Sequence, residues 1–394
     1  MSPHQPEVRP THRLSLRKQR PRWNARVWRL ALALLAALLP GSHASAADRW
    51  TPDEAHQWYA AQPWLVGCNF APGSAINQLE MWQADTFDPA GIERELGWAQ
   101  EIGFNTVRVF LHDLPWKEDR DGFFKRLDAF LEIAARHDIR TMVVIFDGVW
   151  DPDPKTGRQN MPRPGVHNSG WAQSPGRVIL ADADKSAALK PYVVDVLTRY
   201  KDDKRVLLWD LFNEPDNPNT NSYGPLELEK KDEAAARLVK LAFEWAREVG
   251  PSQPLTVGVW AGPAWDCHEE LNQTHLAALE LSDVISFHNY DDAKRMKERI
   301  GELEGYGRPL LCTEFMARGN KSTFEAILPI LKEKKVAAYC WGLVDGKTQT
   351  KQPWSTWKTP ILGEPEPWHH EVFHADGRPY AEEETKLIKD LTAR

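Results

Sequence analysis

Short apolar runs that alternate with amphipathic segments constrain the fold of this chain more than any other feature. Eight runs have the length and composition of buried strands. They cover residues 65–71, 105–111, 141–147, 206–215, 255–260, 283–290, 309–315 and 336–343. Helical patterns lie between several of them, at about 88–102, 122–138, 184–200, 229–249 and 321–335, and a last one covers about 380–392.

This alternation predicts an α/β protein with a parallel sheet. Eight strands without a charged linker or a break in composition predict a single-domain (β/α)8 TIM barrel, with long loops after strands three and eight. An open doubly wound sheet is the alternative. It is less favoured because no G-x-G-x-x-G pattern follows the first strand.

The first 46 residues differ from the rest of the chain. Residues 1–29 contain many arginines, residues 30–39 are apolar, and Ala44-Ser45-Ala46 is a small-x-small site. This pattern predicts a secretory signal peptide over 1–46, cleaved before Ala47, and a secreted or periplasmic protein. A membrane anchor is the alternative, but the apolar run is too short to span a bilayer. Residues 47–394 then form the mature domain.

Charge and cysteine usage exclude several classes of function. Residues 1–46 hold eight of the 49 Lys and Arg residues and one of the 56 acidic residues, so residues 47–394 carry 41 basic and 55 acidic residues, a net charge of −14. This balance argues against a nucleic-acid partner. Cys68, Cys267, Cys312 and Cys340 lack CxxC spacing, so no zinc site is expected. Free buried thiols are favoured over disulfides, and the oligomeric state is left open.

Two glutamates end predicted strands. The run from Val206 ends in Asn213-Glu214-Pro215, and the seventh strand ends near Glu314. A lone glutamate at a strand end is more often a surface residue. In a closed barrel, however, strands four and seven face one another across the catalytic mouth. Paired carboxylates there suit glycoside hydrolysis, in which one protonates the leaving oxygen and the other attacks the sugar or activates water.

Further polar residues lie at neighbouring strand ends: Arg108 in strand two, His288 and Tyr290 in strand six, and Trp341 in strand eight. Together with the two glutamates, this ordered set resembles glycoside hydrolase clan A, and most of all family 5, the family of cellulases, mannanases and exo-β-glycosidases. The resemblance covers essentially all of residues 47–394. It implies a retaining mechanism with Glu214 as acid/base and Glu314 as nucleophile.

The resemblance also implies supporting roles. Arg108 and Tyr290 would hydrogen-bond Glu314 and keep it ionised, and Asn213 would bind the 2-hydroxyl of the sugar. His288 would orient Tyr290 or the acid/base, and Trp341 would form the floor under the reacting sugar. For each residue taken alone, a packed barrel side chain is the alternative.

The third strand departs from the family pattern. Many members carry a histidine at its end, whereas this chain has Asp147, followed by Trp150. His112, just past strand two, either takes part of that role or is a surface loop residue. The departure bears on the choice of sugar and leaves the two glutamates untouched.

Two loops rich in tryptophan follow strands three and eight, at about 148–182 and 345–370. They carry Trp150, Trp171, Trp354, Trp357 and Trp368. Indole faces stack on pyranose rings, so we expect the loops, at opposite parts of the rim, to turn the cleft into a pocket for short substrates or exo action. An open groove lined by the same tryptophans is the alternative. The first loop could also be disordered, but its tryptophans favour packing.

The predicted function is therefore a secreted retaining β-glycoside hydrolase that acts on β-linked glucan- or mannan-type oligo- or polysaccharides. An endo-acting β-1,4-glycanase is the alternative. A non-catalytic carbohydrate-binding barrel would lose one glutamate. A metal-dependent hydrolase barrel would need clustered histidines, but strand one carries Asn69 and no histidine. No cofactor and no metal are predicted.

Overall fold

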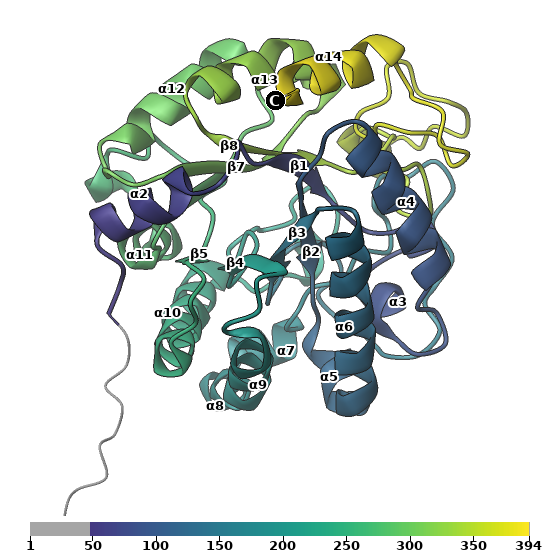
Figure 1. Cartoon of the computed structure of the whole chain (residues 1–394). Coiled ribbons are helices and arrows are strands. Elements are labelled where there is room, and N and C mark those ends of the chain that lie inside the picture. The colour runs from purple at the N-terminus through teal and green to yellow at the C-terminus, as the bar shows by residue number, and fades with distance from the viewer. Residues whose placement is uncertain (1–47, 394) are drawn as a thin grey trace, which may run out of the picture. The chain divides into compact units, whose positions relative to one another are not determined.

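The computed structural model describes residues 48–393, and Figure 1 shows its strands enclosed by helices. The strands are β1 (Val66–Asn69), β2 (Thr106–Phe110), β3 (Arg140–Val144), β4 (Val206–Asp210), β5 (Leu255–Thr256), β6 (Ile285–His288), β7 (Leu310–Phe315) and β8 (Ala337–Trp341). They form one parallel eight-stranded sheet in the order β5-β4-β3-β2-β1-β8-β7-β6. A parallel bridge between Val259 and Phe287 joins the two ends. The predicted (β/α)8 barrel is confirmed.

Helices follow most of the strands and cover the outside of the barrel (Figure 1). The α-helices are α2 (Pro52–Ala60), α3 (Gln78–Trp82), α4 (Pro89–Glu101), α5 (Asp113–Glu118), α6 (Arg120–Arg136), α7 (Arg177–Ala181), α8 (Ala183–Ala187), α9 (Lys190–Tyr200), α10 (Lys231–Val249), α11 (Gln273–Leu281), α12 (Ala293–Glu304), α13 (Phe324–Glu333) and α14 (Glu382–Thr392). Short 3-10 helices are η1 (Gly224–Leu226), η2 (His268–Glu270), η3 (Arg318–Asn320) and η4 (Trp354–Trp357).

Several predicted strands are shorter in the structure, and β4 for example ends at Asp210 rather than at 215. The fifth strand was expected over 255–260, but β5 ends at Thr256 because the Val257 N–H is bound by the Ser282 hydroxyl instead of a neighbouring strand. The helix expected over 184–200 is split into α8 and α9. Proline has no N–H and is favoured in the first turn of a helix, and the new helix α9 begins with Pro191 in that turn.

The N-terminal face of the barrel is closed by α2. Ala55, Trp58 and Tyr59 of this helix pack on a cluster from the barrel floor that includes Met142 and Tyr339. The helix is anchored by a capping box, in which the Thr51 side chain and the N3 glutamate satisfy each other's backbone N–H groups. With this face filled, the carboxyl ends of the strands are where a site can form.

Other sequence predictions concern the termini and the cysteines. The expected signal peptide, residues 1–46, lies outside the described residues. Within 48–393, no helix is long and apolar enough to cross a membrane. All four cysteines are free; Cys68, Cys312 and Cys340 are buried, whereas Cys267 is partly exposed. The loop over 148–182 is packed rather than disordered, with Trp171 only 3 % exposed.

Candidate active site

Arg108, on β2, is the buried centre of a hydrogen-bond network inside the barrel mouth. Its guanidinium donates to Asp210 Oδ2 from Nε and Nη2, at 3.0 and 2.7 Å. Nη1 donates to Asn69 Oδ1 at 2.8 Å and to Glu314 Oε1 at 2.9 Å, and Nη2 donates to Asn213 Oδ1 at 2.7 Å. One fully buried cation therefore balances two carboxylates and fixes two amides.

Glu314, on β7, is held from two sides. Arg108 binds one carboxylate oxygen, and the Tyr290 hydroxyl donates to the other at 2.7 Å. Burial and the neighbouring Glu214 raise the pKa of Glu314, while Arg108 and the Tyr290 hydrogen bond act to lower it. Burial also raises the pKa of Tyr290 well above its usual value, so this hydroxyl keeps its proton and stays a donor.

Glu214 lies just past β4 in a strained backbone conformation, with φ of 38°. The strand-three loop passes directly beneath it, and a Cβ on Gly148 would lie 2.3 Å from the Glu214 carbonyl oxygen. Only glycine permits this approach. Burial raises the pKa of Glu214 to about 7, against a hydrogen bond from Asn217 Nδ2 at 2.6 Å that lowers it. No arginine or lysine donates to this carboxyl group within residues 48–393.

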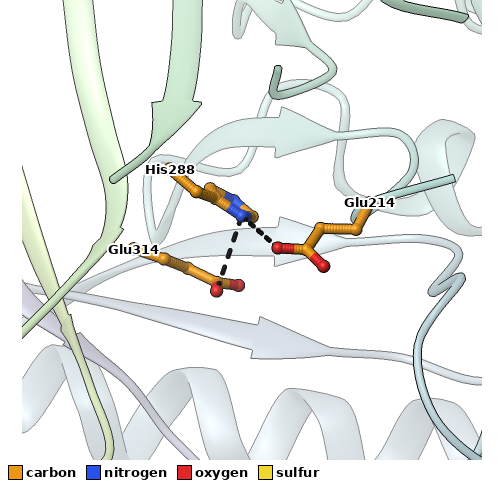
Figure 2. A group of neighbouring side chains, drawn as sticks. All are labelled: Glu214, His288 and Glu314. Atoms are coloured by element: carbon orange, nitrogen blue, oxygen red, sulfur yellow. Dashed lines mark hydrogen bonds and ion pairs between the residues drawn. The ribbon is translucent and has the colours of Figure 1, made fainter. Parts of the chain in front are cut away.

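His288, on β6, lies between the two glutamates (Figure 2). Its Nδ1 is 2.7 Å from Glu214 Oε1 and 3.5 Å from Glu314 Oε2. Burial lowers the pKa of His288 to about 4, so the ring is neutral near pH 7. One proton is therefore shared between Nδ1 and Glu214. Single ligand atoms of the three side chains lie within 4.8 Å of one another.

Asp147 orients the Asn213 side chain by a hydrogen bond. Its amide nitrogen donates to Asp147 Oδ1 at 2.9 Å, while its oxygen accepts from Arg108. Asp147 also accepts from Gln78 Nε2 at 2.8 Å and from Trp171 Nε1 at 2.6 Å. Burial raises the pKa of Asp147 to about 6. Because the amide nitrogen has two N–H groups and Asp147 takes one, the other is free for a ligand.

A cavity of about 270 Å³ lies above these residues. Its floor and walls include both glutamates, Asn213, Tyr290 and Trp341. The other lining residues are Val149, Trp150, His167, Asn168, Trp171, Asn217, Pro218, Asn219, Thr220, Asn221, Ser222, Trp260, Trp354 and His370. The volume is near the lower end of the range for small-molecule pockets, roughly 300–1,000 Å³.

A family model shows to which family the chain belongs. A model of the cellulase family, glycosyl hydrolase family 5, matches residues 76–357. The chain belongs to glycoside hydrolase family 5. It is therefore an O-glycosyl hydrolase with a carbohydrate substrate. No curated protein sequence matches the chain.

Solved structures share the fold at low identity. The GH5_18 protein of Streptomyces cattleya in complex with GlcNAc has 13 % identity and a TM-score of 0.54, over 84 % of this chain and 80 % of that one. The β-1,4-mannanase of the sea hare Aplysia kurodai has 16 % identity and a TM-score of 0.53, over 76 % and 95 %. The exo-β-1,4-mannosidase Op5Man5 of Opitutaceae bacterium strain TAV5 has 18 % identity and a TM-score of 0.54, over 83 % of this chain and 59 % of that one.

Most of the side chains predicted from the family pattern meet at one place. Glu214, Glu314, Asn213, Tyr290 and Trp341 line the cavity, as do the loop residues Trp150 and Trp171. Arg108 and His288 contact the glutamates from within the barrel. Asp147 does not line the cavity and reaches it only through Asn213 and Trp171.

His112 lies elsewhere. Its side chain is fully buried, and Nδ1 accepts from the Leu114 N–H at 3.2 Å, so it caps α5. It does not line the cavity of this family 5 member, and it is not a surface residue either. Neither alternative expected for His112 holds, because its buried ring is used to cap the first turn of α5.

The expected position of the two tryptophan-rich loops was also wrong. They do not face each other across the rim but meet and hydrogen-bond directly. Asn168 N–H donates to Thr348 O at 2.8 Å, and Trp357 Nε1 donates to His167 O at 2.8 Å. Trp357 stacks behind Trp150, and Trp368 is buried away from the cavity. Of the five loop tryptophans, only Trp150, Trp171 and Trp354 line it.

Sequence reasoning missed several residues of the site. Asp210 interrupts the apolar run of β4, and a charge inside such a run is a signal that it has a buried partner. Gln78, His167 and Trp260 carry no comparable signal. They reach the site from α3 and from loops whose course depends on tertiary packing.

One set of side chains has the spacing of a metal site. Among residues 48–393, Glu214, His288 and Glu314 place ligand atoms close enough to share an ion. Both oxygens of Glu314 are already engaged, one by the Arg108 cation and the other by Tyr290. The donor set thus fits a shared proton better than a second positive charge.

Proposed function

We propose that this family 5 glycoside hydrolase cleaves β-glycosides with retention of configuration, with Glu314 as nucleophile and Glu214 as acid/base. The spacing of the carboxylates carries the proposal, because one oxygen of each lies within 4.8 Å of the other. Retaining enzymes hold their carboxyl groups about 5–5.5 Å apart, whereas inverting enzymes need about 6.5–9.5 Å to admit water.

The different surroundings of the two glutamates support the division of roles. Burial raises the pKa of both glutamates. Only Glu314 is bound by Arg108 and Tyr290, whose positive charge and O–H donor favour the ionised, nucleophilic form. Glu214 has no such cation, and burial raises its pKa to about 7. It is therefore protonated in slightly acidic solution, as a general acid must be.

The reaction follows in two steps. The Glu314 carboxylate forms a bond to the anomeric carbon while Glu214 gives its proton to the departing glycosidic oxygen. The Glu214 carboxylate then takes a proton from water, and the water oxygen displaces Glu314 from the sugar. The free N–H of Asn213 is placed to bind the 2-hydroxyl, and Trp341 supplies an apolar face for the ring.

The cavity supports action on short, uncharged substrates. A volume of about 270 Å³ suits one or two sugar units better than a long chain. Mannanases and mannosidases among the structures of the same fold favour β-mannosides as the first substrates to test, with β-glucosides next. We propose exo action, whose products are single sugars; rapid loss of polymer viscosity with mixed-length products would contradict it. Export remains the prediction made from residues 1–46.

The catalytic pair is tested by substitution in the full chain. Glu214→Gln and Glu314→Gln should each lose orders of magnitude in kcat on a β-glycoside that the parent cleaves. Glu95→Gln is the matched control, since Glu95 is buried outside the cavity and burial raises its pKa to about 7, so that it is largely neutral below that pH. Wild-type rates in both active-site variants would refute the assignment.

Azide separates the two roles. With an aryl β-glycoside, azide should rescue Glu314→Ala and give the inverted α-glycosyl azide, because azide replaces the missing nucleophile directly. It should rescue Glu214→Ala with the retained β-glycosyl azide, because it attacks the glycosyl-enzyme. Proton NMR of the products distinguishes the anomers, and the reverse pattern would exchange the roles.

A further inference from the structure

Two histidines of the cavity wall are fixed as hydrogen-bond acceptors. His167 Nδ1 lies 2.7 Å from Gln352 O, and His370 Nδ1 contacts Met316 O. A carbonyl oxygen can only accept, so each Nδ1 carries a proton, and the Nε2 atom of a neutral ring then offers a lone pair. Burial lowers the pKa of His167 to about 3 and that of His370 well below its usual value, so both rings stay neutral.

Asn168, next to His167, has an unsatisfied side chain. It is fully buried, and within the described residues neither its amide nitrogen nor its oxygen has a hydrogen-bond partner. Its backbone is held in the left-handed region, with φ of 45°, by the hydrogen bond to Thr348 O. A buried amide without partners is costly, and this residue borders the cavity. Each of its polar atoms exposes less than 1 Å², so a ligand hydroxyl or a water completes the amide once the side chain turns toward the cavity.

The end of the cavity that these residues form lies beside the proposed nucleophile. His370 and Trp354 pack on Tyr290, with ring centroids 5.5 and 5.1 Å apart, and Tyr290 donates to Glu314. The other end lies beside Glu214, which Asn217 contacts. The nucleophile bonds to the glycone and the acid protonates the leaving group. On the proposed mechanism, the His167–Asn168–His370 end therefore receives the glycone.

This end is closed by bonds between the two loops. His167 N–H donates to Thr356 Oγ1 at 2.9 Å, and Ile361 N–H donates to Gly165 O at 3.0 Å. Trp357 stacks on Trp150 at 5.6 Å as a second layer behind the wall. A chain of several sugars extending past the glycone would meet this wall.

The charges of the cavity favour a neutral sugar. No lysine or arginine is among its lining residues, while Glu214 and Glu314 both are. A carboxylate on the glycone would face imidazole lone pairs and two acidic groups, without a cation to balance it. A sugar hydroxyl, by contrast, can donate to either Nε2 and can both donate to and accept from the Asn168 amide.

We propose that His167, Asn168 and His370 form a glycone-recognition wall, which binds the hydroxyls of one uncharged terminal sugar and excludes uronic acids and internal chain positions. This inference rests on the proposed function for its assignment to the glycone. Its binding chemistry can be measured without turnover.

The test is equilibrium binding to the full chain, followed by tryptophan fluorescence. The probes are D-mannose and D-glucose, with D-mannuronate and D-glucuronate as their charged counterparts. We expect at least one neutral sugar to bind, and its uronate to bind at least about tenfold more weakly. This comparison needs no variant, so a folding defect cannot obscure it.

Asn168→Gly isolates the amide, because glycine accepts the left-handed backbone. It should weaken binding of the neutral sugar about tenfold, the loss expected for hydrogen bonds in a buried site. Asn160→Gly, at an exposed position of the same loop, is the matched control and should leave binding unchanged. His167→Phe removes the Nε2 acceptor and should weaken binding similarly.

Three outcomes would overturn the proposed wall: no binding of any neutral probe, equal binding of a sugar and its uronate, or unchanged binding in Asn168→Gly and His167→Phe. The last result would mean that water alone completes the Asn168 amide. Failure of the proposed function is separate, since it would appear as wild-type turnover in the Glu214 and Glu314 variants.

Discussion

Replacing Arg108 with methionine should destabilise the protein by an amount that depends on pH. The guanidinium is fully buried and forms ion pairs with Asp210 at 2.7 Å and Glu314 at 2.9 Å. Methionine fills similar space but carries no charge or donor. The substitution therefore leaves two carboxylates in the barrel without their cation, and the Asn213 oxygen without its donor.

The magnitude follows from protonation. A buried carboxylate without a partner takes up a proton rather than remain charged. Ordinary carboxyl groups have a pKa near 4, so keeping one protonated at pH 7 costs about 4 kcal/mol, at 1.36 kcal/mol per pH unit. Burial already raises the pKa of Glu314 in the parent protein, so protonating Glu314 in the variant adds less than this to the loss of stability. We expect a loss of about 4–6 kcal/mol at pH 7, compared with about 3–5 kcal/mol for a single broken buried pair.

The sign of the pH dependence is fixed by the same reasoning. In the variant, the folded state holds protons that the unfolded state releases at neutral pH. A carboxyl group whose pKa is raised by folding contributes its full stability below its unfolded pKa and loses it as the pH rises. Between pH 7 and pH 5 the penalty should shrink by about 2.7 kcal/mol for each carboxylate affected.

The measurement is urea unfolding at pH 5, 6 and 7, followed by far-UV circular dichroism and tryptophan fluorescence. Arg378→Met is the control, because Arg378 is 72 % exposed and pairs with the exposed Asp376; it should change nothing measurable at any of these pH values. A difference between Arg108→Met and the parent that is below about 1 kcal/mol, or that does not vary with pH, would refute the reasoning.

Two further predictions concern Glu214. Its pKa of about 7 predicts that kcat/KM falls as the pH rises above 7, because the general acid loses its proton; a rate that stays constant to pH 9 would contradict this. Gly148→Ala should lower both activity and melting temperature, because its Cβ would lie 2.3 Å from the Glu214 carbonyl oxygen. Gly301→Ala in α12 has nothing within 4 Å of the added Cβ and should be neutral or slightly stabilising; equal effects of the two substitutions would argue against close approach as the cause.

Much of the fold was readable from the sequence because each strand had to bury both faces. Such strands appear as continuous apolar runs, and eight of them separated by helices leave few architectures. Exact bounds were less readable. The hydroxyl of Ser282 shortened β5, and Pro191 divided a predicted helix. Each effect depends on a single side chain, whereas hydrophobic periodicity reports only on whole segments.

The site residues likewise divide into those that the sequence predicts and those that it does not. Glu214, Glu314 and Arg108 were predictable because they sit at the ends of strands or within them, where the barrel fixes where their side chains meet. His112 was mispredicted because it lies two residues beyond the end of β2 and caps α5 instead.

The sequence alone determined the reaction class, glycoside hydrolysis. A charged residue in or beside a buried strand needs a functional or structural reason, and this reason can be recognised without knowing how the loops fold. Only the tertiary structure decided which loop residues close the end of the cavity. Loops have no repeating pattern, and the pairing of Asn168 with Thr348 joins positions 180 residues apart in the chain. Which loops meet, and which of their tryptophans turn inward, follows from packing over the whole barrel mouth.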